Sequence, residues 1–436
     1  MVIWKLRQGA DKRIRGGHPW VFSNELSSSP KGIGLGAFIE LQDSRGSFLA
    51  RGYGNPHSLI SFRAVSFNPE EREPLGFLAL VKKLTQAWHV RQNAGFRGSF
   101  RMCFGEADFL PGLVLDYYLI EQNGKKGQVF AAQLVTAGLD KALQDAERFF
   151  KLLVEEAQKQ NLTALGWNET AVVIRNDVNV RKLEGLEVQD PKTIKEISGV
   201  DLAKVDILLN SASDEGVIRM QCDLSEGQKT GFFLDQTQNI FQAVQLFKNW
   251  AKSHPELKSQ PIRILDLCCY VGHWATQITR ALKSQGFNVE VHLGDVSEPA
   301  LAFAKLNAER EGAQVTAHKV DVLEGLDQFA SRSFDIIIAD PPAFIKAKKD
   351  IPTGRHAYLK LNTQAFRMIK AQRFVVSCSC SGLLEEEDFK EAIRKAIQRN
   401  NWQARNLTRG GHAADHPTIL QFPEGFYLKM FTHFVE

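Results

Sequence analysis

The chain has 436 residues, which is too long for one ordinary hydrophobic core and predicts two or three domains. A hydrophobic content of 44% and a charged content of 24% are typical of a folded globular protein, and they exclude a disordered or fibrous chain. No apolar run approaches the length of a membrane span, the first residues lack the apolar stretch of a secretory signal, and six cysteines are too few for a disulfide scaffold. We therefore expect a cytoplasmic protein that does not bind a membrane.

Residues 1–67 contain short apolar runs, such as WVFS, GAFIELQD and LISFRAVS, separated by frequent glycines. This pattern predicts a small all-β domain. The charged, proline-containing segment 67–76 is typical of a linker. Beyond it, helix-like and strand-like segments alternate irregularly over residues 75–187, which predicts a second domain of the α+β class.

Only Asp11 opposes a run of basic residues at the start of the first domain: Lys5, Arg7, Lys12, Arg13 and Arg15. A clustered basic face attracts phosphate groups, so this cluster is a candidate RNA-binding surface. The net charge of +4 is too small to show that the protein binds RNA, and an ordinary solvated surface explains the same residues equally well.

Residues 188–436 are predicted to form the third domain, and from about residue 262 the pattern becomes regular. Strand-like and helix-like segments alternate, beginning with IRILDLCCYV, HWATQITRALKSQG, VEVHLGDV and EPALAFAKLNAEREG. The alternation continues through VTAHKVDV, FDIIIADPP, AYLKLNTQAFRMIK, RFVVSCS and EEEDFKEAIRKAIQRN, and two further strands close it. It predicts a parallel, doubly wound α/β sheet, in which a ligand binds beyond the carboxyl ends of the strands.

Acidic residues fall at the ends of three of these strands: Asp266, Asp295 and Asp321. A carboxylate after the second strand can accept hydrogen bonds from both hydroxyls of a ribose, which fits NAD and S-adenosylmethionine (SAM) equally. The first loop, DLCCYVGHW, distinguishes a SAM site from an NAD site. A dinucleotide site needs several glycines beside the pyrophosphate, and this loop has Gly272 alone. SAM is therefore favoured, although an ordinary strand-to-helix turn would also explain Gly272.

The fourth strand ends in DPPAF, which places Asp340, Pro341, Pro342 and Phe344 at the same edge. Two prolines remove two N–H donors and stiffen the turn. Carbonyl groups and the carboxylate can then face a planar base, and the phenylalanine can stack on it. This segment, following the acidic strand ends, indicates a methyltransferase that acts on a nucleobase.

The next strand ends in VVSCSCSG, so Cys378 and Cys380 also fall at this edge. A lone CxC is a weak metal motif, a disulfide between the two would be strained, and a small buried residue is an adequate explanation of Cys378, as of Cys268 and Cys269. A nucleophile is needed if the target is carbon 5 of a pyrimidine. A thiolate that adds at carbon 6 makes carbon 5 reactive enough to take a methyl group, whereas transfer to a nitrogen needs no cysteine.

Several motifs follow one another along the chain: RIRGGHPWVFSNEL, GEADFLPGLVLDYY, VRKLEGL, GQKTGFFLDQ, DLCCYVGHW, DPPAF, SCSGLL and ADHPTILQFPEGFYLK. In this order they resemble the bacterial 23S rRNA 5-methylcytosine methyltransferases of the RlmI type over nearly the whole chain. The resemblance implies three domains. These are a small β-barrel PUA domain that binds RNA, a central α+β domain, and a Rossmann-like class I methyltransferase domain with a doubly wound sheet.

By this resemblance, Cys380 is the nucleophile and Asp340 orients the cytosine. The residues implied to line the SAM site are Phe233, Gln236, Asp266, Cys268, Tyr270, Gly272, Asp295, Val296, Asp321, Val322, Asp340 and Pro341. Those implied to meet RNA are Lys12, Arg13, Arg15, His18, Pro342 and Phe344. Asp415 and His416 are candidates for the proton acceptor, with a structural turn as the alternative. No metal is implied. The implied partner is 23S rRNA or the assembling large subunit, and a homodimer is left open.

The chain departs from the family pattern at several points. His273 and Trp274 stand where the family usually has a glycine and a phenylalanine, Thr237 replaces the arginine after LDQ, and residues 120–165 look longer than usual. These changes leave methyl transfer intact and the modified nucleotide open. Two other functions compete, namely a guanine-N methyltransferase of rRNA and a non-catalytic assembly factor that keeps a SAM fold. A role for Cys378 in product release is a further alternative.

Overall fold

The computed structural model describes residues 2–213 and 216–436. It divides into two compact units, and the chain passes back and forth between them. The first unit contains residues 1–208, 223–234 and 414–425, and the second contains residues 209–222, 235–413 and 426–436. The predicted boundaries of three domains stay a prediction. None of the helices in the described part of the chain is both long and apolar enough to cross a membrane.

The first unit begins with a small sheet of strand order β1-β3-β4-β5-β2. Its elements are β1 (Val2–Lys5), α1 (Lys12–Arg15), β2 (Trp20–Phe22), β3 (Ala37–Gln42), β4 (Phe48–Gly54) and β5 (Ile60–Ser66). Alternate residues of the strands, among them Trp4, Ile39, Leu41 and Phe62, form one buried cluster. The expected small β domain at the N-terminus is confirmed.

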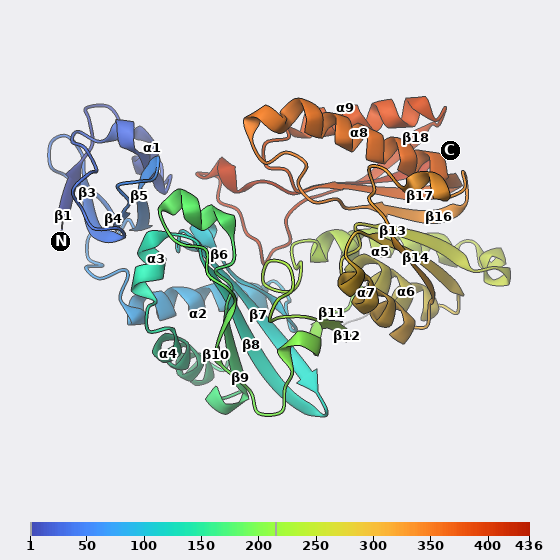
Figure 1. Ribbon diagram of the computed structural model, residues 1–436, viewed down its shortest axis with the longest axis horizontal. Helices are drawn as coiled ribbons and strands as arrows, with labels where there is room; N and C mark the ends of the chain where they lie inside the picture. Colours follow the sequence, from blue (N-terminus) through green and yellow to red (C-terminus); the bar gives the residue numbers. More distant parts are fainter. Residues whose placement is uncertain (1, 214–215) are drawn as a thin grey trace. The chain divides into compact units, whose positions relative to one another are not determined.

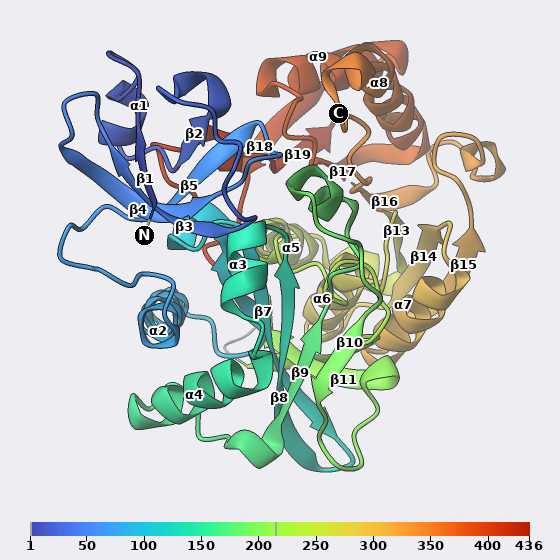
Figure 2. The same ribbon diagram turned by 60° about the vertical axis from the view of Figure 1, so that its left-hand side comes forward.

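A second sheet of the first unit has the order β10-β9-β8-β7-β11, with β6 pairing along β7. Its strands are β6 (Phe100–Phe104), β7 (Leu113–Gln122), β8 (Lys125–Leu134), β9 (Thr170–Ile174), β10 (Lys192–Lys195) and β11 (Val205–Asn210). The helices are α2 (Phe77–Asn93), α3 (Ala137–Ala142) and α4 (Ala146–Lys159), and Figure 2 shows α2 and α4 together beside this sheet. In α4, Phe149, Phe150, Leu153, Val154 and Ala157 recur at helical spacing and are buried.

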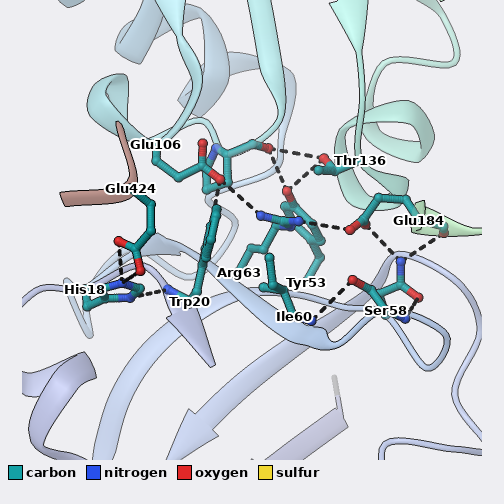
Figure 3. Close-up of polar contacts among 12 residues, drawn as sticks. His18, Trp20, Tyr53, Ser58, Ile60, Arg63, Glu106, Thr136, Glu184 and Glu424 are labelled. Carbon is teal, nitrogen blue, oxygen red and sulfur yellow. Dashed lines mark hydrogen bonds and ion pairs between the residues drawn. The ribbon is translucent and has the colours of Figure 1, made fainter. Parts of the chain in front are cut away.

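Buried charges join the small sheet to the second one (Figure 3). The guanidinium of Arg63 on β5 donates to Glu106 (3.1 Å) and to Glu184 (2.9 Å). The indole of Trp20 also donates to Glu106 (2.7 Å), and its ring lies 5.0 Å from the Arg63 guanidinium. The hydroxyl of Tyr53 donates to the carbonyl of Pro111 (2.6 Å). Because breaking a buried ion pair leaves an uncompensated charge, this network holds the two sheets of the first unit together.

The second unit is built on a sheet of order β15-β14-β13-β16-β17-β19-β18. Its strands are β13 (Ile262–Leu267), β14 (Val289–Asp295), β15 (Gln314–Lys319), β16 (Phe334–Ala339), β17 (Ile369–Ser379), β18 (Ala404–Gly410) and β19 (Lys429–Val435), and β12 (Val217–Cys222) belongs to the same unit. The pairings from β15 to β17 are parallel, and β19 is antiparallel to both of its neighbours.

Helices cover both faces of this sheet (Figure 1). They are α5 (Thr237–Lys252), α6 (His273–Lys283), α7 (Glu298–Arg310), α8 (Ile351–Met368) and α9 (Glu386–Arg399). Alternate strand residues serve opposite faces: Ile336 and Ile338 pack in the cluster with α5 and α6, whereas Ile337 packs with α8 and α9. The predicted doubly wound α/β fold is confirmed.

Short 3-10 helices occur in the connections: η1 (Ser23–Glu25), η2 (Gly105–Asp108), η3 (Trp167–Glu169), η4 (Asn179–Glu184), η5 (Leu202–Lys204), η6 (Pro255–Ser259), η7 (Leu326–Gln328), η8 (Lys348–Asp350) and η9 (Pro423–Gly425).

Candidate active site

The loop between β13 and α6 has an unusual backbone. Cys268 and Tyr270 both have positive φ angles, +59° and +49°, and Gly272 follows at +81°. Positive φ costs a non-glycine residue about 1–2 kcal/mol, so such residues persist where the surrounding structure or the function requires them. A Cβ atom at position 272 would lie 3.0 Å from the Cα of Ala304 on α7. Gly272 therefore permits the close approach of the loop to α7.

Acidic side chains surround this loop. Burial raises the pKa of Asp266 well above its usual range, and the charges of Asp340 and Asp295 raise it further. One carboxylate oxygen of Asp266 accepts from the amide of Ala275 (3.1 Å), and the other is buried without a hydrogen-bond partner in the described part of the chain. Burial also raises the pKa of the Cys268 thiol, and the four carboxylates Asp295, Asp340, Asp266 and Asp321 add to this effect. The loop thus lies in a negative field that favours a cationic ligand.

Asp295 ends β14 and stabilises the same loop. Its carboxylate accepts from the amides of Tyr270 and Ser297, both at 2.9 Å. Each carboxylate oxygen has a second lone pair, so hydroxyl groups of a ligand can still be bound. Asp321 is exposed, and one of its oxygens accepts from the amide of Leu323.

Asp340 is held in place by two side-chain donors. Gln236 donates from Nε2 to one carboxylate oxygen (2.8 Å), and Trp274 donates from its indole N–H to the other (3.0 Å). Gln236 is itself fixed by Asn239 (2.7 Å). Two fixed donors leave the carboxylate oriented before any base arrives, which is the arrangement that preorganised sites use. In the adjoining DPPAF segment, Pro342 is exposed and the Phe344 ring packs against Tyr358.

Cys380 lies at the end of β17, beside the DPPAF segment. It is partly exposed, and its Sγ donates to the carbonyl of Pro341 at 3.6 Å. Cys378 is only 1% exposed, and burial raises the pKa of its thiol well above the usual range. Cys269 is also buried, with the pKa of its thiol raised by burial. The two cysteines of the CxC motif therefore occupy different environments.

The other residues predicted to bind SAM differ in how far they are exposed. Pro341 and Val322 are buried, and Val296 is 60% exposed. Phe233 belongs to the first unit, where the Lys229 ammonium lies 4.3 Å from its ring, so its place beside SAM stays a prediction.

The predicted RNA-binding residues of the first unit differ in how many contacts their side chains make within the protein. Lys12 is exposed, and Arg13 lies over the ring of Phe22. Arg15 is paired with Asp11 (2.5 Å) and Asp43 (2.6 Å). His18 is buried, and it contacts Arg13 and Glu424, the latter at 3.3 Å (Figure 3). Arg13 also lies 3.9 Å from Glu25 and from Glu424, so the exposed Lys12 is the best placed of the four for a phosphate.

Asp415 and His416 are buried in the first unit. Asp415 accepts from the amide of Arg101 (2.9 Å) and from His416 (2.9 Å), and its own carbonyl accepts from Arg91 (2.9 Å). These contacts account for both residues as parts of a turn that ties the segment to β6.

Sequence reasoning missed three contacts around the site. It noted Trp274 only as a departure, although an indole offers an N–H that phenylalanine lacks. It assigned no role to Tyr427, whose hydroxyl donates to Asp235 (2.6 Å). It also overlooked Lys429, whose Nζ donates to the carbonyls of Ser381 (3.0 Å) and Tyr427 (2.9 Å). The contacts of Tyr427 and Lys429 depend on the antiparallel pairing of β19 with β17, which no local motif announces.

Known proteins match the chain over its whole length. It is 31% identical to Ribosomal RNA large subunit methyltransferase I of Photobacterium profundum, covering 99% of this chain and 98% of that protein. The protein of the same name from Pseudoalteromonas translucida is also 31% identical, over 97% of both chains. The chain belongs to the ribosomal RNA large subunit methyltransferase I family. Two descriptions of domain families match parts of it, a PUA-like domain at residues 5–67 and a methyltransferase domain at residues 258–420.

Solved structures agree with this family on the fold. A Streptococcus mutans protein assigned to the SAM-dependent methyltransferases has a TM-score of 0.70, with 16% identity and full coverage of both chains. A second structure, of an assigned methyltransferase complexed with SAH, has a TM-score of 0.71, also with 16% identity and full coverage. The predicted PUA-like and class I methyltransferase folds are thereby confirmed.

This large subunit methyltransferase I family member is SAM-dependent, and its residues fit that cofactor. SAM carries a positive sulfonium and an amino group, which suit the carboxylates of Asp295 and Asp340. The unpartnered oxygen of Asp266 and the irregular loop 268–272 offer further polar contacts.

Proposed function

We propose that this protein transfers a methyl group from SAM to carbon 5 of a cytosine in 23S rRNA of the large ribosomal subunit. The relatives that are about 30% identical over the full length are named as large subunit rRNA methyltransferases. The observation that carries the cytosine assignment is the position of Cys380. Its thiol is partly exposed at the carboxyl edge of the sheet and contacts Pro341, the residue after Asp340.

The other thiols of β17 and of the loop between β13 and α6 fit the role of nucleophile less well. Cys269 and Cys378 are buried, and burial raises the pKa of both thiols. Cys268 is partly exposed, but burial of its thiol raises its pKa, and four carboxylates raise it further. Because the thiolate is the reactive form of cysteine, Cys380 is the residue we assign as nucleophile.

Covalent catalysis then proceeds in balanced steps. The thiolate of Cys380 forms a bond to carbon 6 of the cytosine, and the electron pair of the 5,6 double bond makes carbon 5 nucleophilic. Asp340, fixed by Gln236 and Trp274, orients the ring through hydrogen bonding. SAM supplies the methyl group, which passes to carbon 5 as its bond to sulfur breaks. A base removes the proton from carbon 5, the double bond reforms, and the thiolate of Cys380 leaves.

Recognition of RNA is proposed for both units. Lys12, Arg13 and Arg15 are assigned to phosphate groups because they are the exposed basic residues of α1. The exposed Pro342 and the half-buried ring of Phe344 are assigned to the target base.

The test is nucleoside mass spectrometry after incubation of the protein with SAM and unmodified 23S rRNA. We expect 5-methylcytidine from the wild type, and a loss of more than about 1,000-fold in rate for Cys380→Ala, because removal of a nucleophile abolishes the covalent route. Cys378→Ala is the matched control, since it removes a thiol of the same strand and should keep activity within a few-fold.

Two outcomes would favour the competing functions. A methylguanosine product that survives Cys380→Ala would establish a guanine-N methyltransferase, because transfer to nitrogen needs no thiolate. Absence of both product and SAM binding in a calorimetric titration would instead support a non-catalytic assembly factor.

A further inference from the structure

Lys429 crosses the end of β17 next to Cys380. It opens β19 and pairs with Ser379 in the antiparallel register of the two strands. Its half-buried side chain reaches back so that Nζ donates to the carbonyl of Ser381 at 3.0 Å and to that of Tyr427 at 2.9 Å. Lys429 therefore touches the residues on both sides of Cys380 along the chain, one through its backbone pairing and the other through its ammonium.

The ammonium of Lys429 is close enough to Cys380 for their charges to interact. Burial lowers the pKa of Lys429, whereas a negative charge on Cys380 raises it, followed by smaller effects of Glu385 and Glu386. By reciprocity, a charge on Lys429 favours the thiolate of Cys380 to the same extent. Two carbonyls take two of the three N–H donors of an ammonium, so one donor is left over for another acceptor.

Of the two carboxylates that raise the pKa of Lys429, Glu385 and Glu386, the second is paired with other cations. Glu386 accepts from Arg409 and from Lys390, both at 2.7 Å. Asp340 is bound by Gln236 and Trp274, and the Tyr358 hydroxyl is bonded to Ser381 (2.8 Å). Charges on Cys380 interact with the Tyr358 phenol and with the Lys429 ammonium, and Lys429 is a cation held at the end of the strand that carries Cys380.

We propose that Lys429 is a positioning residue that stabilises the thiolate of Cys380 and fixes the backbone of the Ser381 turn. This inference rests on the proposed function, because it matters for catalysis only if Cys380 is the nucleophile. The role depends on charge. A lysine that served only to satisfy two carbonyls could be replaced by any donor of suitable length, whereas stabilisation of a thiolate requires a cation.

The test measures the reactivity of Cys380 directly, with neither RNA nor SAM present. The full-length protein is alkylated with iodoacetamide over a range of pH, and modification of Cys380 is followed by peptide mass spectrometry so that the other cysteines do not interfere. In Lys429→Met we expect the midpoint of the pH profile to rise by about one unit, which is a tenfold slower reaction near neutral pH. In Lys429→Arg we expect a midpoint close to that of the wild type.

Matched variants separate charge from structure. Lys395→Met removes an exposed lysine of α9 in the same unit and should leave the profile unchanged. Lys429→Gln and Lys429→Arg both keep an N–H donor for the turn, and only the arginine keeps the positive charge. If Lys429→Met fails to fold, the difference between these two profiles shows whether the charge is needed. Equal alkylation profiles of Lys429→Gln, Lys429→Arg and the wild type would overturn the proposal.

The result is also independent of the methylation assay. If the profile shifts but no 5-methylcytidine is formed by the wild type, the proposed function is wrong and the interaction of Lys429 with Cys380 stands. If 5-methylcytidine is formed and the profile does not shift, the proposed function stands and the role of Lys429 is wrong.

Discussion

At the scale of single residues, the hydrogen bonds to Asp340 show where sequence reasoning stops. The motif DPPAF predicted that this carboxylate lies at the edge of the sheet, and the structure places it there. Its two donors come from positions 66 and 104 residues earlier in the chain. A motif describes neighbours in sequence, so it could not reveal Gln236 as a donor to Asp340 or explain why Trp274 departs from the family pattern.

Replacement of Trp274 by phenylalanine should slow methyl transfer. The variant keeps an aromatic ring but removes the N–H that Asp340 accepts, and loss of a hydrogen bond to a charged group costs about 1.5–3 kcal/mol. We expect kcat to fall by about 10- to 100-fold while SAM affinity stays within a few-fold. Single-turnover methylation and calorimetric SAM binding measure the two quantities.

Trp402→Phe provides the matched control for that variant. Its indole N–H also donates a hydrogen bond, to the carbonyl of Phe366 (2.7 Å), but on α8 rather than at Asp340. It should lower stability without changing kcat. Equal effects of the two substitutions on kcat would show that the bond to Asp340 has no special role.

At the scale of elements, periodicity predicted the helices and strands of the second unit well but not their order in space. Apolar residues at periods of two and 3.6 identify β13 to β17 and their helices, because each element must bury one face. The order of the strands in the sheet does not follow their order in the chain, since β19 lies between β17 and β18 and runs antiparallel to both. Strand partners are chosen by tertiary packing, which leaves no periodic signal in the chain.

The loop between β13 and α6 should tolerate no side chain at position 272. Gly272→Ala places a Cβ about 3.0 Å from the backbone of Ala304, so the loop or α7 must shift. We expect SAM affinity to fall by at least about tenfold in calorimetry, in addition to the roughly 1–2 kcal/mol that positive φ costs an alanine.

Gly286→Ala isolates the backbone cost. Gly286 has the same φ of +81°, but the nearest atom to its added Cβ is the flexible Lys258 ammonium at 3.6 Å. This variant should lose stability and keep its affinity for SAM. If both alanines weaken SAM binding equally, the close approach to α7 is not what shapes the loop.

At the scale of the whole molecule, the stability of the second unit should depend on a buried histidine. His433 lies in the middle of β19 near the rings of Phe366 and Phe431, and its Nε2 has no hydrogen-bond partner in the described part of the chain. Burial lowers the pKa of His433 to about 4. Between this value and the ordinary pKa of about 6.5, the unfolded chain binds a proton that the folded chain does not.

Acid should therefore destabilise the protein through His433. As the pH falls from about 6.5 to about 4, this residue should remove up to about 3 kcal/mol from the free energy of unfolding. Urea unfolding across that range should show a flatter pH dependence for His433→Phe than for the wild type. His356→Gln, which changes an exposed histidine of α8, should retain the wild-type slope. An unchanged slope in His433→Phe would contradict this assignment.

The place of β19 in the sheet also has a consequence for synthesis. A ribosome makes β17 and β18 before it reaches residues 429–435, yet these two strands pair with β19 rather than with each other. Both therefore wait with unpaired edges while the nascent chain is extended, even though earlier parts can already fold. Cys380 lies at the end of one of them, and Lys429 arrives with the missing strand. The edge that carries the proposed nucleophile can thus be assembled only after residue 435 has left the ribosome, so a nascent chain arrested earlier should carry no methyltransferase activity.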